Sequence, residues 1–249
     1  MPLPQVPRID RLLLAELVLP SWHPRAADGR GLVLGYVVHH PDGPVVVDTG
    51  VGRGSALIEE LYRPTTSDLV SRLAEVGVDE RDVAAVVCSH LHFDHCGQAA
   101  TLFAPVHVQA AEREAATAPG YTVPEWVALP ESRWRAAQGD VELAEGVRIL
   151  ATPGHTPGHQ SVVVAGGDEV VVLAGQCTYT AAEFAAGTVA AEDAHDPSWH
   201  ESALESVRRL RALRPTRVLF AHDEDELTED VMRPGQPPPA ERRPARPPA

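Results

Sequence analysis

The residues best suited to chemistry in this 249-residue sequence are three histidines and an aspartate within one six-residue stretch. They are His90, His92, Asp94 and His95, in the pattern His-x-His-x-Asp-His. Imidazole and carboxylate groups bind zinc and similar divalent ions when several converge to within about 2.0–2.2 Å of the metal. A strand end followed by a loop can aim side chains at positions i and i+2 together. The stretch therefore predicts a metal site in preference to a solvated polar loop.

Two further histidine-bearing segments support this interpretation. Residues 152–159 read TPGHTPGH and contain His155, and His222 lies alone after a late apolar run. A single histidine in a turn usually has a structural role, but three such segments, each at a predicted strand end, favour convergence on a metal. We expect His159 to support the TPGH turn. The other histidines are expected to have ordinary surface or core roles: His23, His39, His40, His107, His195 and His200.

Short apolar runs bounded by turn residues predict the strands that would carry these side chains. The predicted strands are residues 32–40, 44–48, 83–88, 105–109, 147–151, 160–165, 169–174 and 217–221. The first two flank Pro41-Asp42-Gly43, a turn sequence typical of a hairpin. Each candidate ligand segment follows directly from one of these strands.

Two amphipathic segments predict helices. Ser67 is expected to cap the first, which ends at Gly77. The second begins at Asp196, has Pro197 in its first turn and ends before Pro215. Their buried faces are expected to consist of Leu69, Val70, Leu73 and Val76 in the first helix and of Leu204, Val207, Leu210 and Leu213 in the second.

The order of these elements predicts an α/β fold. Strands and helices alternate in two halves, residues 30–110 and 140–222, which suits two sheets packed face to face with helices outside. We expect one domain over residues 1–233. Residues 234–249 are rich in proline and are expected to form a disordered tail.

The motifs together resemble the metallo-β-lactamase superfamily, of which the VVVDTG segment at residues 45–50 is also typical. The resemblance spans residues 30–225 and implies a four-layer αβ/βα sandwich with the metals at one edge. It implies a hydrolase that uses a metal-bound hydroxide. It also implies two ligand groups, namely His90, His92 and His155 for the first metal and Asp94, His95 and His222 for the second.

The sequence departs from this family at one position. The family normally bridges its two metals with an aspartate at the end of the strand after TPGH, where Gln176 stands here. A carboxamide has one coordinating oxygen and no charge, so Gln176 is a candidate ligand that cannot bridge two cations. We therefore predict a first site of ordinary affinity and a weakened second site. Cys177 is a candidate soft ligand, but adjacent strand residues point to opposite faces, which favours a packed thiol.

Residues 176–180 (QCTYT) and 154–161 (GHTPGHQS) together resemble the N-acyl homoserine lactonase branch. This resemblance implies that Tyr179 contacts the substrate carbonyl or the leaving oxygen, where a phenol can donate a hydrogen bond to an oxyanion. The alternative is a half-buried packing role. Asp94 could orient the hydroxide and carry a proton to the leaving group. The predicted reaction is hydrolysis of a lactone or a related carboxylic ester in a small-molecule acyl substrate.

Residues 118–140 contain Tyr121, Trp126 and Trp134 among several prolines. These aromatic side chains could line an acyl pocket, and they could equally anchor a long loop to the core. The sequence does not decide between the two roles.

Two other functions compete with lactone hydrolysis. A thioester hydrolase of the glyoxalase type usually carries a basic C-terminal region for an anionic thiol cofactor, whereas residues 223–226 are acidic here. A degenerate metal-binding protein would explain Gln176 but not the six other intact ligand positions. Zinc is the expected metal, one ion or two, with iron or manganese as alternatives.

Composition limits the partners and the location. A formal net charge of −14 argues against nucleic acid and anionic membranes, because both select for Lys and Arg. Three irregularly spaced cysteines do not form a disulfide framework. The apolar run at residues 12–19 is short and contains Glu16, so it resembles neither a signal peptide nor a membrane span. We expect a cytoplasmic protein; the sequence leaves its oligomeric state open, with a homodimer as one option.

Overall fold

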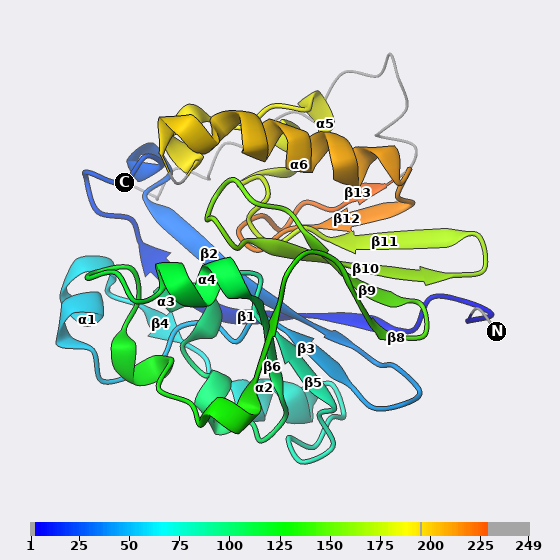
Figure 1. Ribbon diagram of the computed structural model, residues 1–249. Helices are drawn as coiled ribbons and strands as arrows, with labels where there is room; N and C mark the ends of the chain where they lie inside the picture. The colour runs from blue at the N-terminus through cyan, green and yellow to red at the C-terminus, as the bar shows by residue number, and fades with distance from the viewer. Residues whose placement is uncertain (1–2, 195, 229–249) are drawn as a thin grey trace, which may run out of the picture.

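A computed structural model of the protein describes residues 3–194 and 196–228. Two sheets lie face to face, with helices on their outer sides (Figure 1). Their strands are β1 (Ile9–Val18), β2 (Arg30–Val38), β3 (Val45–Val47), β4 (Thr65–Thr66), β5 (Ala85–Val87), β6 (Val106–Gln109), β7 (Trp134–Ala137), β8 (Val141–Ala144), β9 (Val147–Ala151), β10 (Gln160–Gly166), β11 (Glu169–Leu173), β12 (Arg217–Leu219) and β13 (Leu227–Thr228). The strand order is β4-β1-β2-β3-β5-β6-β7 in the first sheet and β13-β12-β11-β10-β9-β8 in the second.

The helices complete the outer layers. They are α1 (Ala56–Tyr62), α2 (Leu69–Glu75), α3 (Phe93–Cys96), α4 (Ala110–Ala115), α5 (Ala181–Ala186) and α6 (His200–Ala212). Helices α1 and α2 pack on the outer face of the first sheet, and α5 and α6 cover the second (Figure 1).

Three apolar clusters separate the four layers. In β10, Val162 and Val164 face the first sheet, while Val163 faces the helices α5 and α6. The strand β3 behaves in the same way, because Val45 and Val47 point between the sheets and Val46 points outward. Alternate residues point to opposite faces of a strand, so strands that are buried on both faces must be apolar throughout. This explains the valine runs in the sequence and confirms the predicted four-layer sandwich.

The predicted strands all form, with ends that differ by up to two residues. The predicted hairpin is present, since Val38 pairs with Val45 across the turn. The strand β1 was not predicted: the apolar run that is too short for a membrane span pairs with β2 along nine positions. Within the described residues, no helix combines the length and the apolar composition that crossing a bilayer requires.

Both predicted helices form, and the starting point of each needs correction. Asp196 caps a single 3-10 turn, and α6 follows and buries Val207 and Leu210. In α2 the cap is Asp68 instead of the predicted Ser67, because the Asp68 carboxylate accepts a 2.8 Å hydrogen bond from the backbone N–H of Ser71. Serine and aspartate are comparable N-cap residues, so the backbone conformation determines which of the two neighbours caps the helix.

The directions of the strands bring the carboxyl-terminal ends of strands from both sheets to one edge of the sandwich. Strands β3 and β5 are parallel, and in the second sheet β9, β11 and β12 all run in one direction. Hydrogen bonds join the sheets there, from the backbone N–H of Gln160 to the carbonyl of Ser89 and from that of Leu34 to Ala221, each 2.8 Å long. Segments that are distant in sequence therefore meet at this edge.

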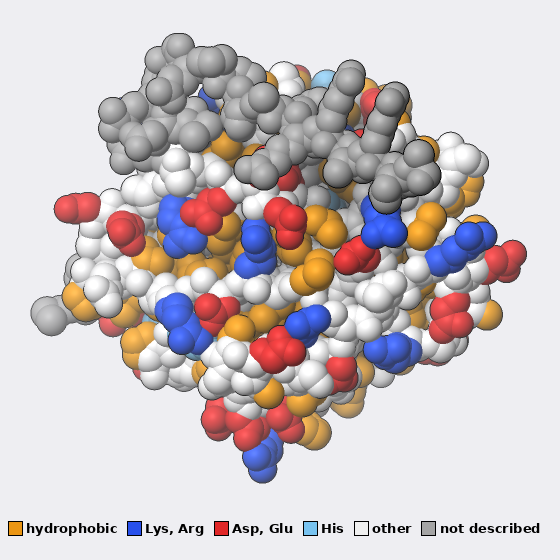
Figure 2. All heavy atoms as spheres, turned by 180° about the vertical axis from the view of Figure 1, so that it is seen from behind, with side chains coloured by type: hydrophobic (Ala, Val, Ile, Leu, Met, Phe, Trp, Pro, Cys, Tyr) orange, Lys and Arg blue, Asp and Glu red, His pale blue; other side chains and the backbone are white. Residues whose placement is uncertain are grey.

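The distribution of charged side chains on one face of the protein is consistent with the expectation, from the net charge, that it does not bind nucleic acid. On the face seen in Figure 2, basic side chains are interspersed with acidic ones and do not gather into a patch. The described residues on this face therefore form no continuous positive surface for a phosphate backbone. The proline-rich segment 234–249 and the domain boundary placed at residue 233 lie outside the described residues.

The cap of α2 can be tested directly. Asp68→Ala should lower the free energy of unfolding by about 1 kcal/mol, because a backbone N–H of the first turn loses its acceptor. Ser67→Ala should cost less. Urea denaturation of both variants measures the difference, and an equal or greater loss for Ser67→Ala would contradict the assignment.

Candidate metal centre

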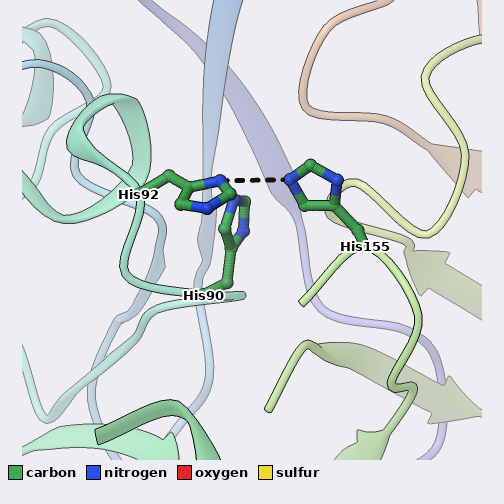
Figure 3. A group of neighbouring side chains, drawn as sticks. All are labelled: His90, His92 and His155. Atoms are coloured by element: carbon green, nitrogen blue, oxygen red, sulfur yellow. Dashed lines mark hydrogen bonds between the residues drawn. The ribbon is translucent and has the colours of Figure 1, made fainter. Parts of the chain in front are cut away.

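The first predicted ligand group converges as expected. His90 follows β5, His92 precedes α3 and His155 lies in the loop after β9, and their ligand atoms all lie within 4.8 Å of one another. His92 Nδ1 is 3.0 Å from His90 Nε2 and 3.2 Å from His155 Nε2 (Figure 3). Nitrogens on a tetrahedral zinc ion, each at 2.0–2.1 Å, are about 3.3 Å apart. The spacing therefore fits a divalent ion among the three rings.

The second predicted group forms beside the first. Asp94, His95 and His222 also place their ligand atoms within 4.8 Å of one another. The two imidazoles approach to 3.2 Å through their Nε2 atoms. Gln176 Oε1 lies 3.0 Å from His222 Nε2, so the amide does reach this group. Cys177 is buried in the apolar cluster under α5 and α6, which supports the packed-thiol interpretation.

Hydrogen bonds on the far side of the rings orient the histidines. The Nδ1–H groups of His155 and His222 donate to the backbone carbonyls of Asp193 and Leu32, over 2.8 and 2.7 Å. Such bonds fix the tautomer and leave Nε2 with a free lone pair, as metal-binding histidines require. The donor set and its supports thus suit a divalent ion such as zinc at both groups.

Asp48 has a supporting role that the sequence alone did not reveal. Its carboxylate accepts hydrogen bonds from the backbone N–H and the hydroxyl of Ser89, over 2.7 and 2.9 Å, and from His95 Nδ1–H over 2.8 Å. Its φ of 61° is uncommon for a residue other than glycine and directs the side chain toward the site. The aspartate of the VVVDTG segment therefore orients His95 and fixes the end of β5.

Burial sets the charge state of most of these rings. It lowers the pKa of His90 and His155 well below the usual range, and that of His222 to about 4. A neutral ring is the form that binds metal.

The carboxylates near His95 have the opposite effect. Burial by itself would lower the pKa of His95, but the carboxylates of Asp94 and Asp48 raise it to about 9. Burial likewise acts to raise the pKa of Asp94, yet His95 and His222 lower it overall. An ion that binds to the second group must therefore displace a proton from His95.

Glu112, also unpredicted, joins the two loops that carry the first group. Its fully buried carboxylate accepts hydrogen bonds from the backbone N–H of Leu91 (2.8 Å) and of Gly158 (3.1 Å). It also accepts from the hydroxyls of Thr156 and Tyr121, over 2.7 and 2.6 Å. Leu91 lies between two ligands, and Thr156 follows the third. One carboxylate therefore sets the distance between the loops.

His159 supports the turn, as predicted. Its Nδ1–H donates to the carbonyl of Thr152 over 3.0 Å, and its Nε2 accepts from the backbone N–H of Gln176 over 3.0 Å. The ring therefore links the TPGH turn to the loop that carries Gln176.

Both ligand groups open into a cleft of about 490 Å³. Its apolar lining includes Leu17, Leu19, Tyr62 and Phe93, which all belong to or pack against the same core cluster. Tyr179 lies in its wall, with its ring stacked on that of His222 at a centroid distance of 4.8 Å.

The aromatic residues of segment 118–140 divide between the two roles left open. Tyr121 lines the cleft, whereas Trp126 and Trp134 are buried in the core and anchor the segment. His23, for which we expected an ordinary surface or core role, also lines the cleft. His23 lies in the loop after β1, and the residues around it in the sequence form no motif that would predict a position in the cleft.

Comparison with known proteins agrees with this geometry. The family model of the metallo-β-lactamase superfamily matches residues 28–222. The chain therefore belongs to the metallo-β-lactamase superfamily. An N-acyl homoserine lactonase from Bacillus sp is 33% identical, over 76% of this chain and 80% of that protein. The N-acyl homoserine lactonase AiiB of Agrobacterium fabrum is 28% identical, over 78% and 80%.

Solved structures give the same result. An N-acyl homoserine lactone hydrolase, with N-hexanoyl-L-homoserine bound at its catalytic metal centre, has a TM-score of 0.74. It is 29% identical, with coverage of 88% of this chain and 94% of that one. The dizinc lactonase AidC, at 14% identity and a TM-score of 0.64, shares the fold. These findings confirm a metal-dependent hydrolase close to the lactonase branch and do not favour a glyoxalase-type thioester hydrolase or a degenerate protein.

Glu112→Gln should lower zinc affinity at the first group by about 10- to 100-fold, because an amide NH2 would replace one of the accepting oxygens. Competition with a chelator measures the affinity. Glu226→Gln, which removes a carboxylate paired with Arg217, is the control and should retain zinc normally. Unchanged affinity in Glu112→Gln would show that the loops keep their distance without this carboxylate.

Gln176→Asp should strengthen the second group, since it supplies a negative charge between two dications. We expect the wild type to lose its second ion to a chelator before the first, and the variant to retain both. Metal analysis along a chelator titration makes the comparison. Equal stoichiometry and equal retention in the two proteins would refute the weakened second site.

Proposed function

We propose that this protein hydrolyses lactones and that N-acyl homoserine lactones are its substrate class. The observation that carries the proposal is the placement of two metal-ligand groups and Tyr179 in one cleft with a partly apolar lining. The lactonases that resemble the chain, one of them with an N-acyl homoserine at its metal centre, support the same substrate class.

The cleft accommodates both parts of such a molecule. The lactone ring would lie at the ligand groups, and the acyl chain would extend along the apolar lining that includes Leu17, Leu19, Tyr62 and Phe93. Burial of each methylene of the chain contributes about 0.8 kcal/mol, which favours acylated over free homoserine lactone.

We assign zinc to His90, His92 and His155 and to Asp94, His95 and His222, because their donors are imidazole and carboxylate groups. Zinc lowers the pKa of a coordinated water and polarises a carbonyl.

The protein's own groups handle the proton and the developing charge. In the reaction, a water oxygen adds to the ester carbonyl carbon, the ring C–O bond breaks, and the leaving oxygen takes a proton to give a hydroxy acid. Asp94, whose pKa is lowered, is ionised in the cleft and can hold and pass that proton. Burial raises the pKa of Tyr179, so its phenol keeps the hydrogen it donates to the oxyanion.

Three free, buried cysteines suit a reducing compartment, which supports the cytoplasmic location expected from the sequence. A homodimer stays a prediction.

Purified, zinc-loaded protein should open N-acyl homoserine lactones in preference to thioesters and β-lactams in a side-by-side assay. Tyr179→Phe should lower lactone turnover by roughly 100-fold, the cost of one oxyanion donor, while metal content stays the same. Unaltered turnover in this variant would give Tyr179 a packing role. If the fully zinc-loaded protein does not hydrolyse lactones, the proposed function is wrong.

A further inference from the structure

Arg25 lies behind the wall of the cleft, in contact with Tyr179. Its guanidinium carbon is 4.6 Å from the centroid of the Tyr179 ring, a cation–π distance. The Arg25 side chain is 20% exposed and is not among the side chains that line the cleft, so it faces the cleft through the Tyr179 ring. The same tyrosine ring stacks on His222, one of the ligands of the second group.

Two carboxylates hold the guanidinium in place. Arg25 donates to Glu183 and, over 2.7 Å, to Asp193. All three side chains are largely buried, with 20%, 18% and 9% of their surfaces exposed. A guanidinium is planar and carries several donors, so it can stack on a ring and bind two carboxylates at once.

Each carboxylate belongs to a segment that matters to the site. Glu183 is part of the capping box of α5, which Thr180 begins directly after Tyr179. Asp193 lines the cleft, and its backbone carbonyl accepts the hydrogen bond that orients His155. Arg25 thus connects the loop after β1, the segment that carries Tyr179 and the segment that supports a ligand of the first group.

We propose that Arg25 is a positioning residue for the lactonase reaction, which holds the Tyr179 ring against His222 with its phenol in place for the substrate. The proposal rests on the proposed function. Arg25 acts through Tyr179, and its effect on turnover therefore depends on the Tyr179 hydroxyl. An ion pair that only fastened the loop after β1 would affect turnover equally with or without that hydroxyl.

A double-mutant cycle separates these two roles. Arg25→Met should lower the kcat for an N-acyl homoserine lactone about tenfold at unchanged zinc content, because the ring loses its cation–π partner. In the Tyr179→Phe background the same change should have little further effect. Arg25→Lys keeps the charge but not the planar fork, so its kcat should be intermediate. An equal loss in both backgrounds would overturn the proposal.

Two further variants serve as controls for the loss of an arginine and for poor folding. Arg209→Met removes another arginine that binds a carboxylate and a backbone carbonyl, away from the cleft, and should leave kcat unchanged. The single variant Arg25→Met leaves two carboxylates without their partner and could fold poorly. Combining it with Glu183→Gln removes one of these charges, and a glutamine at position 183 is still compatible with the capping box. This combination should show the same dependence on the Tyr179 hydroxyl.

NMR tests whether Arg25 holds the Tyr179 ring in place without an activity measurement. The chain has four tyrosines, and NMR with tyrosine labelled with ¹³C in the ring resolves Tyr179, which Tyr179→Phe identifies. Arg25→Met should raise the flip rate of the Tyr179 ring about tenfold, and Arg209→Met should not. An unchanged flip rate would overturn the proposal. Absence of lactone hydrolysis with an accelerated flip would instead count against the proposed function alone.

Discussion

The centre of this protein depends on imidazole rings that are held in fixed orientations inside an apolar sandwich. Placing them in an apolar sandwich removes their hydration, which favours the neutral form and leaves each ring needing a partner for its second nitrogen. The backbone carbonyls of Leu32 and Asp193 and the carboxylate of Asp48 provide such partners. Among the described residues, no buried side-chain nitrogen or oxygen lacks a hydrogen-bond partner. The ligand atoms can therefore face one another before an ion arrives.

The same requirement explains the buried carboxylates around the site. Asp48 and Glu112 lie almost completely inside the protein and accept several hydrogen bonds each, which offsets the cost of removing a charge from water. Because their donors come from different loops, these carboxylates also fix the distance between the loops. Rigid loops allow separate segments to act as one ligand set, since metal geometry tolerates displacements of only a few tenths of an ångström.

The two ligand groups differ in electrostatics although they lie side by side. Histidines alone form the first, and burial lowers the pKa of two of them, His90 and His155, well below the usual range. Carboxylates surround His95 in the second group and hold a proton on it, and the uncharged Gln176 stands beside His222. A second dication therefore meets proton competition and less compensating negative charge than the bridging aspartate of the family would supply. This difference is local, because the fold of the sandwich does not depend on it.

The four-layer sandwich and the candidate ligand side chains could be predicted from the sequence, because both leave local patterns. Valine runs mark strands buried on both faces, and the spacing of His90, His92 and Asp94 marks a ligand-bearing turn. The roles of Arg25, Asp48 and Glu112, and the position of His23 in the cleft lining, emerge only from the folded arrangement. The partners of Arg25, Asp48 and Glu112 are many residues away in the chain, so no short-range pattern reveals these roles. The choice of Asp68 over Ser67 as a cap was likewise decided by backbone conformation, which two equally suitable neighbours do not encode.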